Sequence, residues 1–328
     1  MRAVGRRLAF FVVTLWAAVT LNFLLPRLMP GNPVEALLAQ YPHITPQAFR
    51  ALTTLLGGGQ HQSVIVQYGE YWKRVVTLNF GISITTSFGT PVRTLVMNAL
   101  PWTLGLVGVT TVFAFVLGTF IGLLSAWRRG TWLDNLLPPM AVIGFALPYF
   151  WVGLLLVYIF SVTLGWLPYE DAYNIITDSP AWNLTFIFDV LRHAILPGMT
   201  IIITQIGLWI LFMRNNTVTV LAEDYVRMAK AKGLKPWRVM WAYAGRNAIL
   251  PNLTGFAMAL GFVVSGAILV EYVFNYPGLG GLLLRAVEGL DYPLMQALFL
   301  LITLAVLFSL LFCDVLTAIL DPRTRESS

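Results

Sequence analysis

The chain has 328 residues, of which 58% are apolar and only 11% are charged. This balance excludes an ordinary soluble domain, in which about a quarter of the residues are charged. The net charge of +6 is accompanied by no nucleic-acid-binding motif, so no nucleic-acid partner is expected. The single cysteine, Cys313, excludes an intramolecular disulfide and a cysteine zinc site, and no metal site is predicted.

Six segments of about 20 or more largely apolar residues follow one another along the chain, each long enough to cross about 30 Å of hydrocarbon. They cover residues 8–28, 102–127, 133–164, 195–213, 253–273 and 294–320. The first is too long for the apolar part of a signal peptide and has no small-residue cleavage site, so we interpret it as an anchor. The sequence therefore predicts an all-α, polytopic membrane protein with about six transmembrane helices.

Residues 30–100, after the first segment, are too many for a tight connection and carry helix signals of their own. A Thr45-Pro46 start and a Gly57–Gly59 stop indicate one helix, residues 63–78 are a second amphipathic stretch, and Thr90-Pro91 opens a third. Three aromatic residues of the second stretch suit a helix at the membrane interface: Tyr68, Tyr71 and Trp72. A helical insertion is therefore predicted here.

Basic residues gather on one side of the predicted bundle. Of the 21 Lys and Arg residues, 14 lie at the N-terminus (Arg2, Arg6, Arg7), at Arg128 and Arg129, between Arg214 and Arg246, or at Arg323 and Arg325. Cytoplasmic loops of membrane proteins carry an excess of Lys and Arg. This side is therefore predicted to be cytoplasmic, with both chain ends inside and the insertion outside.

Six residues within or beside the apolar segments are candidates for the wall of a translocation pathway: Tyr149, Gln205, Thr254, Met258, Ser265 and Glu271. Tyr149 follows Pro148, which is predicted to kink the third segment. Each polar side chain can equally bond neighbouring helices, at about 0.6 kcal/mol, and Tyr149 can equally serve packing. Glu271 fits either the outer rim of the pathway or a carboxylate bonded to backbone amides of residues 276–280.

Residues 214–250 form a polar, mostly basic island between two apolar segments. Its apolar residues recur at the spacing of an amphipathic helix: Leu221, Tyr225, Met228 and Ala229. Gly233 is a natural residue to end this helix, and Pro236 fits the first turn of a second one. A helix of about 11 residues is marginal alone in water, so we expect it to rest on a partner surface.

Two stretches of this island resemble a known family. Residues 223–234 read Glu-Asp-Tyr-Val-Arg-Met-Ala-Lys-Ala-Lys-Gly-Leu, and residues 246–251 read Arg-Asn-Ala-Ile-Leu-Pro. They are similar to the cytoplasmic coupling loop of ABC importer permeases of the dipeptide/oligopeptide and nickel family, in the first-permease subunit. The family's general Glu-Ala-Ala triplet is absent and the Gly-to-Pro spacing is longer, which is usual for the peptide branch. Tyr-Pro-Gly-Leu-Gly at 276–280 and Asp-Tyr-Pro at 291–293 extend the resemblance.

The resemblance implies a type I ABC importer permease fold, with an anchor at 1–29, an extracytoplasmic insertion at 30–100 and a permease core at 101–328. The chain would form half of a pathway for dipeptides or oligopeptides in a bacterial or archaeal plasma membrane. Its implied partners are a second permease, two ABC ATPase subunits, an extracytoplasmic substrate-binding protein and membrane lipid. The residues implied to seat on an ATPase subunit are Glu223, Asp224, Tyr225, Arg227, Met228, Ala229, Lys230, Lys232 and Gly233.

ATP chemistry is not expected in this chain. Residues 56–60, Leu-Gly-Gly-Gly-Gln, lack the serine of the ABC ATPase signature, and no phosphate-binding Gly-x-x-x-x-Gly-Lys-Ser/Thr loop is present. The chain is thus predicted to be no enzyme and to hold no cofactor, with ATP and Mg²⁺ bound by the partner ATPases.

The substrate class remains open, and two other function classes compete with the importer. The same architecture also serves oligosaccharides and nickel complexes. A secondary transporter would show an internal repeat and several intramembrane carboxylates, whereas no repeat is found and the intramembrane acids are few. An intramembrane enzyme would need a catalytic cluster, whereas His43, His61 and His193 lie outside the apolar segments in no catalytic motif.

Overall fold

The computed structural model describes residues 2–30, 63–174, 183–265 and 267–320. Within these ranges the chain is helical, and its only β pairing is an isolated bridge between Ile82 and Pro91. The described chain groups into two compact units. The first comprises Met1–Pro101 with Gly278–Leu307, and the second comprises Trp102–Pro277 with Phe308–Ser328. The division into anchor, insertion and core stays a prediction, as does the helix expected at residues 45–59, which lies outside the described ranges.

The first unit contains α1 (Arg2–Leu28), α4 (Val64–Thr77), most of α5 (Val92–Thr103), α14 (Leu279–Glu288) and the first part of α15 (Tyr292–Leu320). The second amphipathic stretch predicted from the sequence is confirmed as α4. Its cap is local, because the Ser63 side chain accepts a hydrogen bond from the Val66 amide. The helix predicted to start at Thr90-Pro91 is also confirmed, since α5 begins directly after these two residues.

The aromatic side of α4 packs on α1. The rings of Tyr68 and Tyr71 lie 5.1 and 5.7 Å from the Phe23 ring, and the Tyr68 hydroxyl is 2.7 Å from the Thr20 hydroxyl. Tyr71 is only 3% exposed. The Tyr71 ring is therefore used for packing against α1, and the position of α4 at the membrane interface stays a prediction.

A buried carboxylate ties the segment before α5 to the start of α15, within the first unit. Asp291 Oδ2 accepts hydrogen bonds from the Ser83 hydroxyl and from the amides of Ile84, Thr85 and Thr86, the last three at 3.1, 3.2 and 3.0 Å. Its Oδ1 lies 3.4 Å from the Leu294 amide in the first turn of α15. Successive amides converging on one oxygen form an anion-binding nest, which compensates the burial of the charge.

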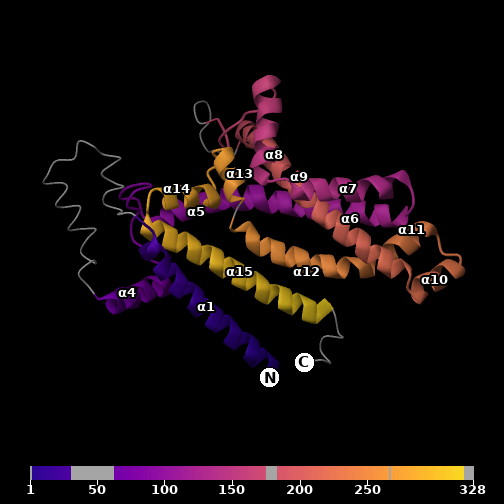
Figure 1. Cartoon of the computed structure of the whole chain (residues 1–328), viewed down its shortest axis with the longest axis horizontal. Helices are drawn as coiled ribbons and strands as arrows, with labels where there is room; N and C mark the ends of the chain where they lie inside the picture. The colour runs from indigo at the N-terminus through magenta and orange to yellow at the C-terminus, as the bar shows by residue number, and fades with distance from the viewer. Residues whose placement is uncertain (1, 31–62, 175–182, 266, 321–328) are drawn as a thin grey trace. The chain divides into compact units, whose positions relative to one another are not determined.

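The second unit is built around the long helix α9 (Leu184–Leu221). The helices α6 (Val109–Trp127), α7 (Trp132–Ala146), α8 (Tyr149–Leu156) and α12 (Arg246–Val263) pack against it, and α6, α7 and α9 run side by side (Figure 1). Shorter pieces complete the unit: α10 (Asp224–Ala231), α11 (Pro236–Arg238), α13 (Ile268–Val273) and the π-helical turns η1 (Leu104–Gly108), η2 (Val157–Thr163) and η3 (Val239–Gly245).

Glycines allow the backbones of α6, α7 and α9 to approach closely. A Cβ at Gly207 of α9 would lie 2.2 Å from the carbonyl oxygen of Ala141 in α7, and one at Gly122 of α6 would lie 2.5 Å from that of Ile210. Small residues serve this purpose in membrane helix bundles, where dispersion contacts replace the hydrophobic drive. The core of the unit is therefore held by backbone proximity as well as by side-chain packing.

Four described helices are long and apolar enough to cross a membrane: Ala9–Leu28, Val92–Trp127, Leu184–Leu221 and Tyr292–Cys313. A fifth crossing is formed if Trp132–Ala146 and Tyr149–Thr163 count as one span, which bends by 97° at the predicted proline break. The segment expected at 253–273 is not one continuous span. It is divided between α12 and α13, and α12 carries Arg246, Asn247 and Asn252.

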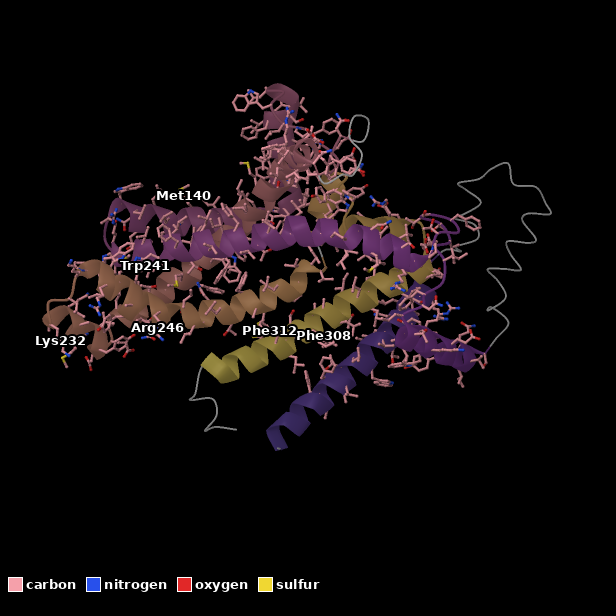
Figure 2. All side chains as sticks on the ribbon, turned by 180° about the vertical axis from the view of Figure 1, so that it is seen from behind. Met140, Lys232, Trp241, Arg246, Phe308 and Phe312 are labelled. Carbon is pink, nitrogen blue, oxygen red and sulfur yellow. The ribbon has the colours of Figure 1, made fainter. Side chains whose placement is uncertain are left out.

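Many large apolar side chains on these helices face outward. Met140 on α7 is 56% exposed, and Phe308 and Phe312, one turn apart on α15, are 57% and 56% exposed (Figure 2). Exposed apolar surface of this extent is unusual for a protein in water but suits a surface in contact with lipid tails.

Candidate functional site

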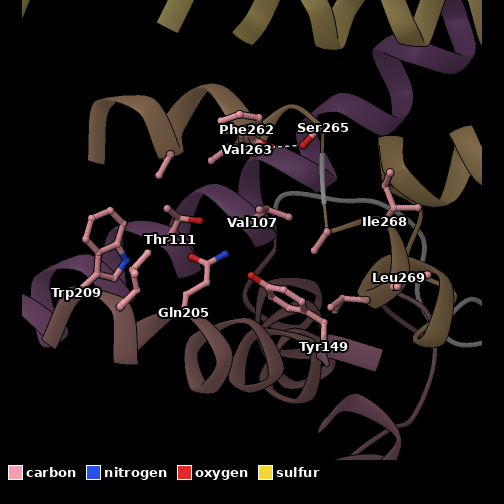
Figure 3. A pocket seen from close by; sticks show the side chains of 14 residues that line it. Val107, Thr111, Tyr149, Gln205, Trp209, Phe262, Val263, Ser265, Ile268 and Leu269 are labelled. Carbon is pink, nitrogen blue, oxygen red and sulfur yellow. Dashed lines mark hydrogen bonds between the residues drawn. The ribbon is translucent and has the colours of Figure 1, made fainter. Parts of the chain in front are cut away.

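A partly open cavity of about 440 Å³ lies in the second unit, between α6, α8, α9, α12 and α13 (Figure 3). Its lining residues are Val107, Thr111, Tyr149, Gln205, Leu208, Trp209, Ala259, Phe262, Val263, Ser265, Ala267, Ile268, Leu269 and Val270. None of them carries a charge. The wall is therefore apolar with a few uncharged polar groups, the usual composition of a site for a small ligand.

The structure brings three of the six pathway candidates together. Tyr149, Gln205 and Ser265 all line the cavity, and Figure 3 shows the Tyr149 hydroxyl directed toward the Gln205 amide. The bend between α7 and α8 places Tyr149 there, because Tyr149 is the first residue of α8 after Pro148. Ser265 is turned to its own chain, since its hydroxyl donates to the Phe262 carbonyl at 2.5 Å.

The other three candidates lie outside this lining. The Thr254 hydroxyl is 3.4 Å from the Leu250 carbonyl one turn earlier on α12, and Met258 is 40% exposed on the same helix. Glu271 is fully buried, and its carboxylate accepts a hydrogen bond of 2.8 Å from the Thr103 hydroxyl. Their role in a pathway stays a prediction.

Glu271 also shapes the turn that follows it. The backbone amide of Tyr276 donates to the Glu271 carbonyl at 2.7 Å, and the Tyr276 ring is buried edge-on to Trp102. Burial, reinforced by the nearby Glu271 charge, raises the pKa of Tyr276 above its ordinary value. The raised pKa strengthens the preference of the Tyr276 hydroxyl for its neutral form.

Residues missed by sequence reasoning complete the wall. Thr111 is only 2% exposed and faces the cavity from α6, while Trp209 on α9 is held by an edge contact of 5.2 Å with the Phe115 ring. Thr111 follows Thr110 inside an apolar segment, and such a pair of hydroxyls in apolar surroundings could have indicated a polar wall residue. Threonine side chains usually bond their own helix, so the sequence does not distinguish which of the two faces a cavity.

The second candidate site is α10, at one end of the second unit (Figure 1). Its predicted end is confirmed, because Gly233 follows the helix with φ +72°, the left-handed conformation that favours glycine. The buried side of α10 consists of Val226 and Ala229, which pack with Val239 of η3. Of the predicted stripe, Leu221 and Ala229 pack inward with Val226, whereas Tyr225 and Met228 lie on the open side, and their contact with a partner stays a prediction.

The remaining surface of α10 is open. Met228 and Tyr225 are 60% and 39% exposed, and Arg227 forms an exposed ion pair with Asp224 at 3.6 Å. Tyr225 is fixed by the Asn247 amide, which donates to its hydroxyl at 2.7 Å. The helix α10 therefore has a packed inner side and an exposed outer side that carries a large apolar residue.

The surroundings of α10 are basic. Lys230 lies over the Trp127 ring at 5.6 Å, while Lys232 and Arg246 both lie toward the α10 end of the unit (Figure 2). Glu223 precedes the helix as its cap residue but makes no side-chain capping bond. The region thus offers cations and the apolar Met228 to whatever covers it.

The family model for the "Binding-protein-dependent transport system inner membrane component" matches residues 118–326, more than half of the chain. The chain belongs to this family. Members are inner-membrane transport components, which agrees with the several apolar helices of the structure. The matched residues include α10, Tyr149 and Gln205, and begin after Thr111.

Similarity to individual permeases extends over nearly the whole chain. The di/tripeptide transport system permease protein DppB of Pseudomonas aeruginosa is 33% identical, with 98% of each chain covered. The oligopeptide transport system permease protein AppB of Bacillus subtilis is 34% identical over 97% of each chain. The glutathione transport system permease protein GsiC of Escherichia coli is 35% identical, covering 98% of this chain and 97% of the relative.

Proposed function

We propose that this chain is the permease subunit of an ATP-driven, binding-protein-dependent importer of short peptides. The observation that carries the coupling part of this proposal is α10, a helix of eight residues whose inner side is buried on η3 while Met228 stays exposed. A displacement of α10 would be passed directly to η3 and α12, because these elements are contiguous and packed. Membership in the family of binding-protein-dependent inner-membrane transport components supports the import part of the proposal.

The partners in this proposal are two ABC ATPase subunits that bind ATP and Mg²⁺, a second related permease, and an extracytoplasmic substrate-binding protein. The coupling surface comprises residues 223–233, including Lys230, Lys232 and Gly233. Exposed ion pairs contribute only about 0–1 kcal/mol, so Met228 and Tyr225 are expected to carry more of the contact than the lysines.

The coupling proposal is tested in the assembled complex by Gly233→Trp, with Gly233→Ala as the control. Nothing lies within 4 Å of a Cβ at Gly233, so both variants share the backbone strain of φ +72° and differ in the bulk that projects outward. Gly233→Trp is expected to abolish transport while ATP hydrolysis persists, and Gly233→Ala to retain most transport. Normal transport by Gly233→Trp would refute the assignment of α10.

The proposed orientation places both chain ends in the cytoplasm and the insertion outside. A Cys313→Ala chain with a new cysteine at Gly58 is expected to react with a membrane-impermeant thiol reagent added to intact cells. A tag after Arg323 should be reached only after the membrane is opened. Reaction at the tag alone in intact cells would reverse the orientation and remove α10 from the ATPase side.

Short peptides are proposed as substrate because the similar permeases are named for di/tripeptide, oligopeptide and glutathione transport. Calorimetry on the partner binding protein tests this, with tripeptides, xylo-oligosaccharides and nickel complexes as ligands. Tight binding of tripeptides is expected. Binding of oligosaccharides or nickel alone would remove the peptide substrate and leave the importer assignment intact.

A further inference from the structure

We infer that the cavity of the second unit binds the main chain of the transported peptide through the Gln205 amide and the Thr111 and Tyr149 hydroxyls, without reading side-chain charge. This inference rests on the proposed function. It adds a binding subsite, its three polar residues and a rule of selectivity.

The three polar groups lack partners in the part of the chain that the structure describes. No side-chain hydrogen bond there engages Thr111, Tyr149 or Gln205, although all three line the cavity. Other buried threonines nearby behave differently. The hydroxyls of Thr110 and Thr204 bond carbonyls one turn earlier, at 2.6 and 2.8 Å.

A polar group without a hydrogen bond is unfavourable inside a membrane protein. Its removal from water is not compensated, and lipid offers no partner. Thr111 is 98% removed from solvent contact by its neighbours, with 2% exposure remaining. Tyr149 is 38% exposed and Gln205 is half-buried, so with Thr111 they present hydrogen-bonding groups that a solute in the cavity can reach.

A peptide main chain has the matching groups. The Gln205 amide offers donors and an acceptor, the same pair that a peptide bond presents, and each hydroxyl both donates and accepts. Three such groups from α6, α8 and α9 surround the space from separate helices (Figure 3). At about 440 Å³ the cavity falls within the range of roughly 300–1,000 Å³ usual for small-ligand sites.

The lining also predicts that the site does not select peptides by the charge of their side chains. It contains no Asp, Glu, Lys, Arg or His, so it offers no ion pair to a charged side chain. Its remaining wall is apolar, with Leu208, Trp209 and Phe262 among the largest side chains. The site therefore holds the invariant part of every peptide and tolerates the variable part.

The test uses the complete complex in proteoliposomes with three tripeptides, Ala-Ala-Ala, Ala-Lys-Ala and Ala-Asp-Ala, each at a concentration that saturates the binding protein. The unmodified complex is expected to transport all three at rates within about twofold. Gln205→Glu introduces one negative charge into the lining and should favour Ala-Lys-Ala over Ala-Asp-Ala by about tenfold, because a desolvated charge pair is weakly screened. A purely structural role for Gln205 would not change this preference.

A second variant measures the main-chain bonds. Gln205→Leu keeps the approximate volume and removes the amide, so transport of all three peptides should fall by the same factor, about tenfold. The matched control is Thr204→Val, because Thr204 is the adjacent residue and its hydroxyl bonds its own helix. This control should transport at the unmodified rate.

The outcomes separate the inference from the proposed function. If the unmodified complex transports peptides while Gln205→Glu acquires no charge preference and Gln205→Leu loses nothing, the subsite is refuted and the importer assignment stands. If Gln205→Leu reduces transport of only one tripeptide, the site reads side chains and the inference is also wrong. If the unmodified complex transports none of the peptides, the proposed function itself fails.

Discussion

Replacing Gly207 by alanine is expected to force α7 and α9 apart. A Cβ at this position would lie 2.2 Å from the Ala141 carbonyl oxygen and 3.1 Å from its Cα, whereas real Cβ contacts essentially never fall below 3.0 Å. The obstructing atoms belong to the backbone, so no side-chain rotation relieves the clash. The helices themselves must move. The cavity residue Gln205 lies on α9 two positions before Gly207, so it moves with that helix.

The cost follows from this geometry. Overpacking a core costs about 1–3 kcal/mol when side chains can adjust, and a backbone obstruction places Gly207→Ala at the upper end, about 3 kcal/mol. Gly105→Ala is the control, because nothing lies within 4 Å of its Cβ. Alanine is the better helix former, so this control should be neutral or more stable by up to about 1 kcal/mol.

The assay is reversible unfolding of the purified chain in mixed micelles with increasing sodium dodecyl sulfate, followed by tryptophan fluorescence. The free energy of unfolding should fall for Gly207→Ala and not for Gly105→Ala. Equal stability of Gly207→Ala and the unmodified chain would show that α7 and α9 do not approach as closely as described, and the position of Gln205 in the cavity wall would need revision.

Two further predictions concern buried charges and use the same assay. Asp291→Asn weakens four bonds to one carboxylate oxygen and should lower the free energy of unfolding by about 2–3 kcal/mol, against about ±0.5 kcal/mol for the exposed Glu288→Gln. Similar small losses of unfolding free energy for both variants would contradict the bonding of Asp291 to the amides of residues 84–86. Asp134 pairs with Arg214 at 2.6 Å, and removing either partner by alanine should cost about 3–5 kcal/mol. The double variant should lose less than the two single losses combined, and full additivity would show that the pair does not interact.

The sequence predicts features that depend on neighbouring residues. The end of α10 at Gly233 and the break at Pro148 are both confirmed, because the backbone conformations they require are properties of glycine and proline themselves. The start of α4 after Ser63 belongs to the same class. In each case a local chemical rule determines a local structural result.

Features that depend on distant partners are predicted less well. Helical spacing groups Tyr225, Met228 and Ala229 on one stripe of α10, but the location of Val239 decides that Val226 and Ala229 form the side buried within this chain. The division of the expected span at 253–273 has no strong signal, because the residues around the break are mostly apolar. Composition identifies a membrane segment without revealing where tertiary packing interrupts its helix.

The cavity shows the same limit. The sequence predicts Gln205 and Tyr149 as pathway residues because they are polar residues in apolar surroundings, and both line the wall. It does not predict Thr111, because a threonine that bonds its own helix and a threonine that faces a cavity look alike in sequence. The packing of α6 against α9 makes the distinction, and it is set by Gly118 and Gly122, whose Cβ atoms would clash with α9.

The Asp291 nest has a consequence for how the chain is made. The Ser83 hydroxyl and its carboxylate partner are separated by 208 positions in the sequence. At about 5–20 residues per second, a ribosome needs roughly 10–40 s to add the acceptor after the donors have emerged. During that interval the amides of Ile84, Thr85 and Thr86 have no access to Asp291. The segment before α5 therefore completes its structure late in synthesis, and a chain truncated before Asp291 should expose it to proteases for as long as the fragment survives.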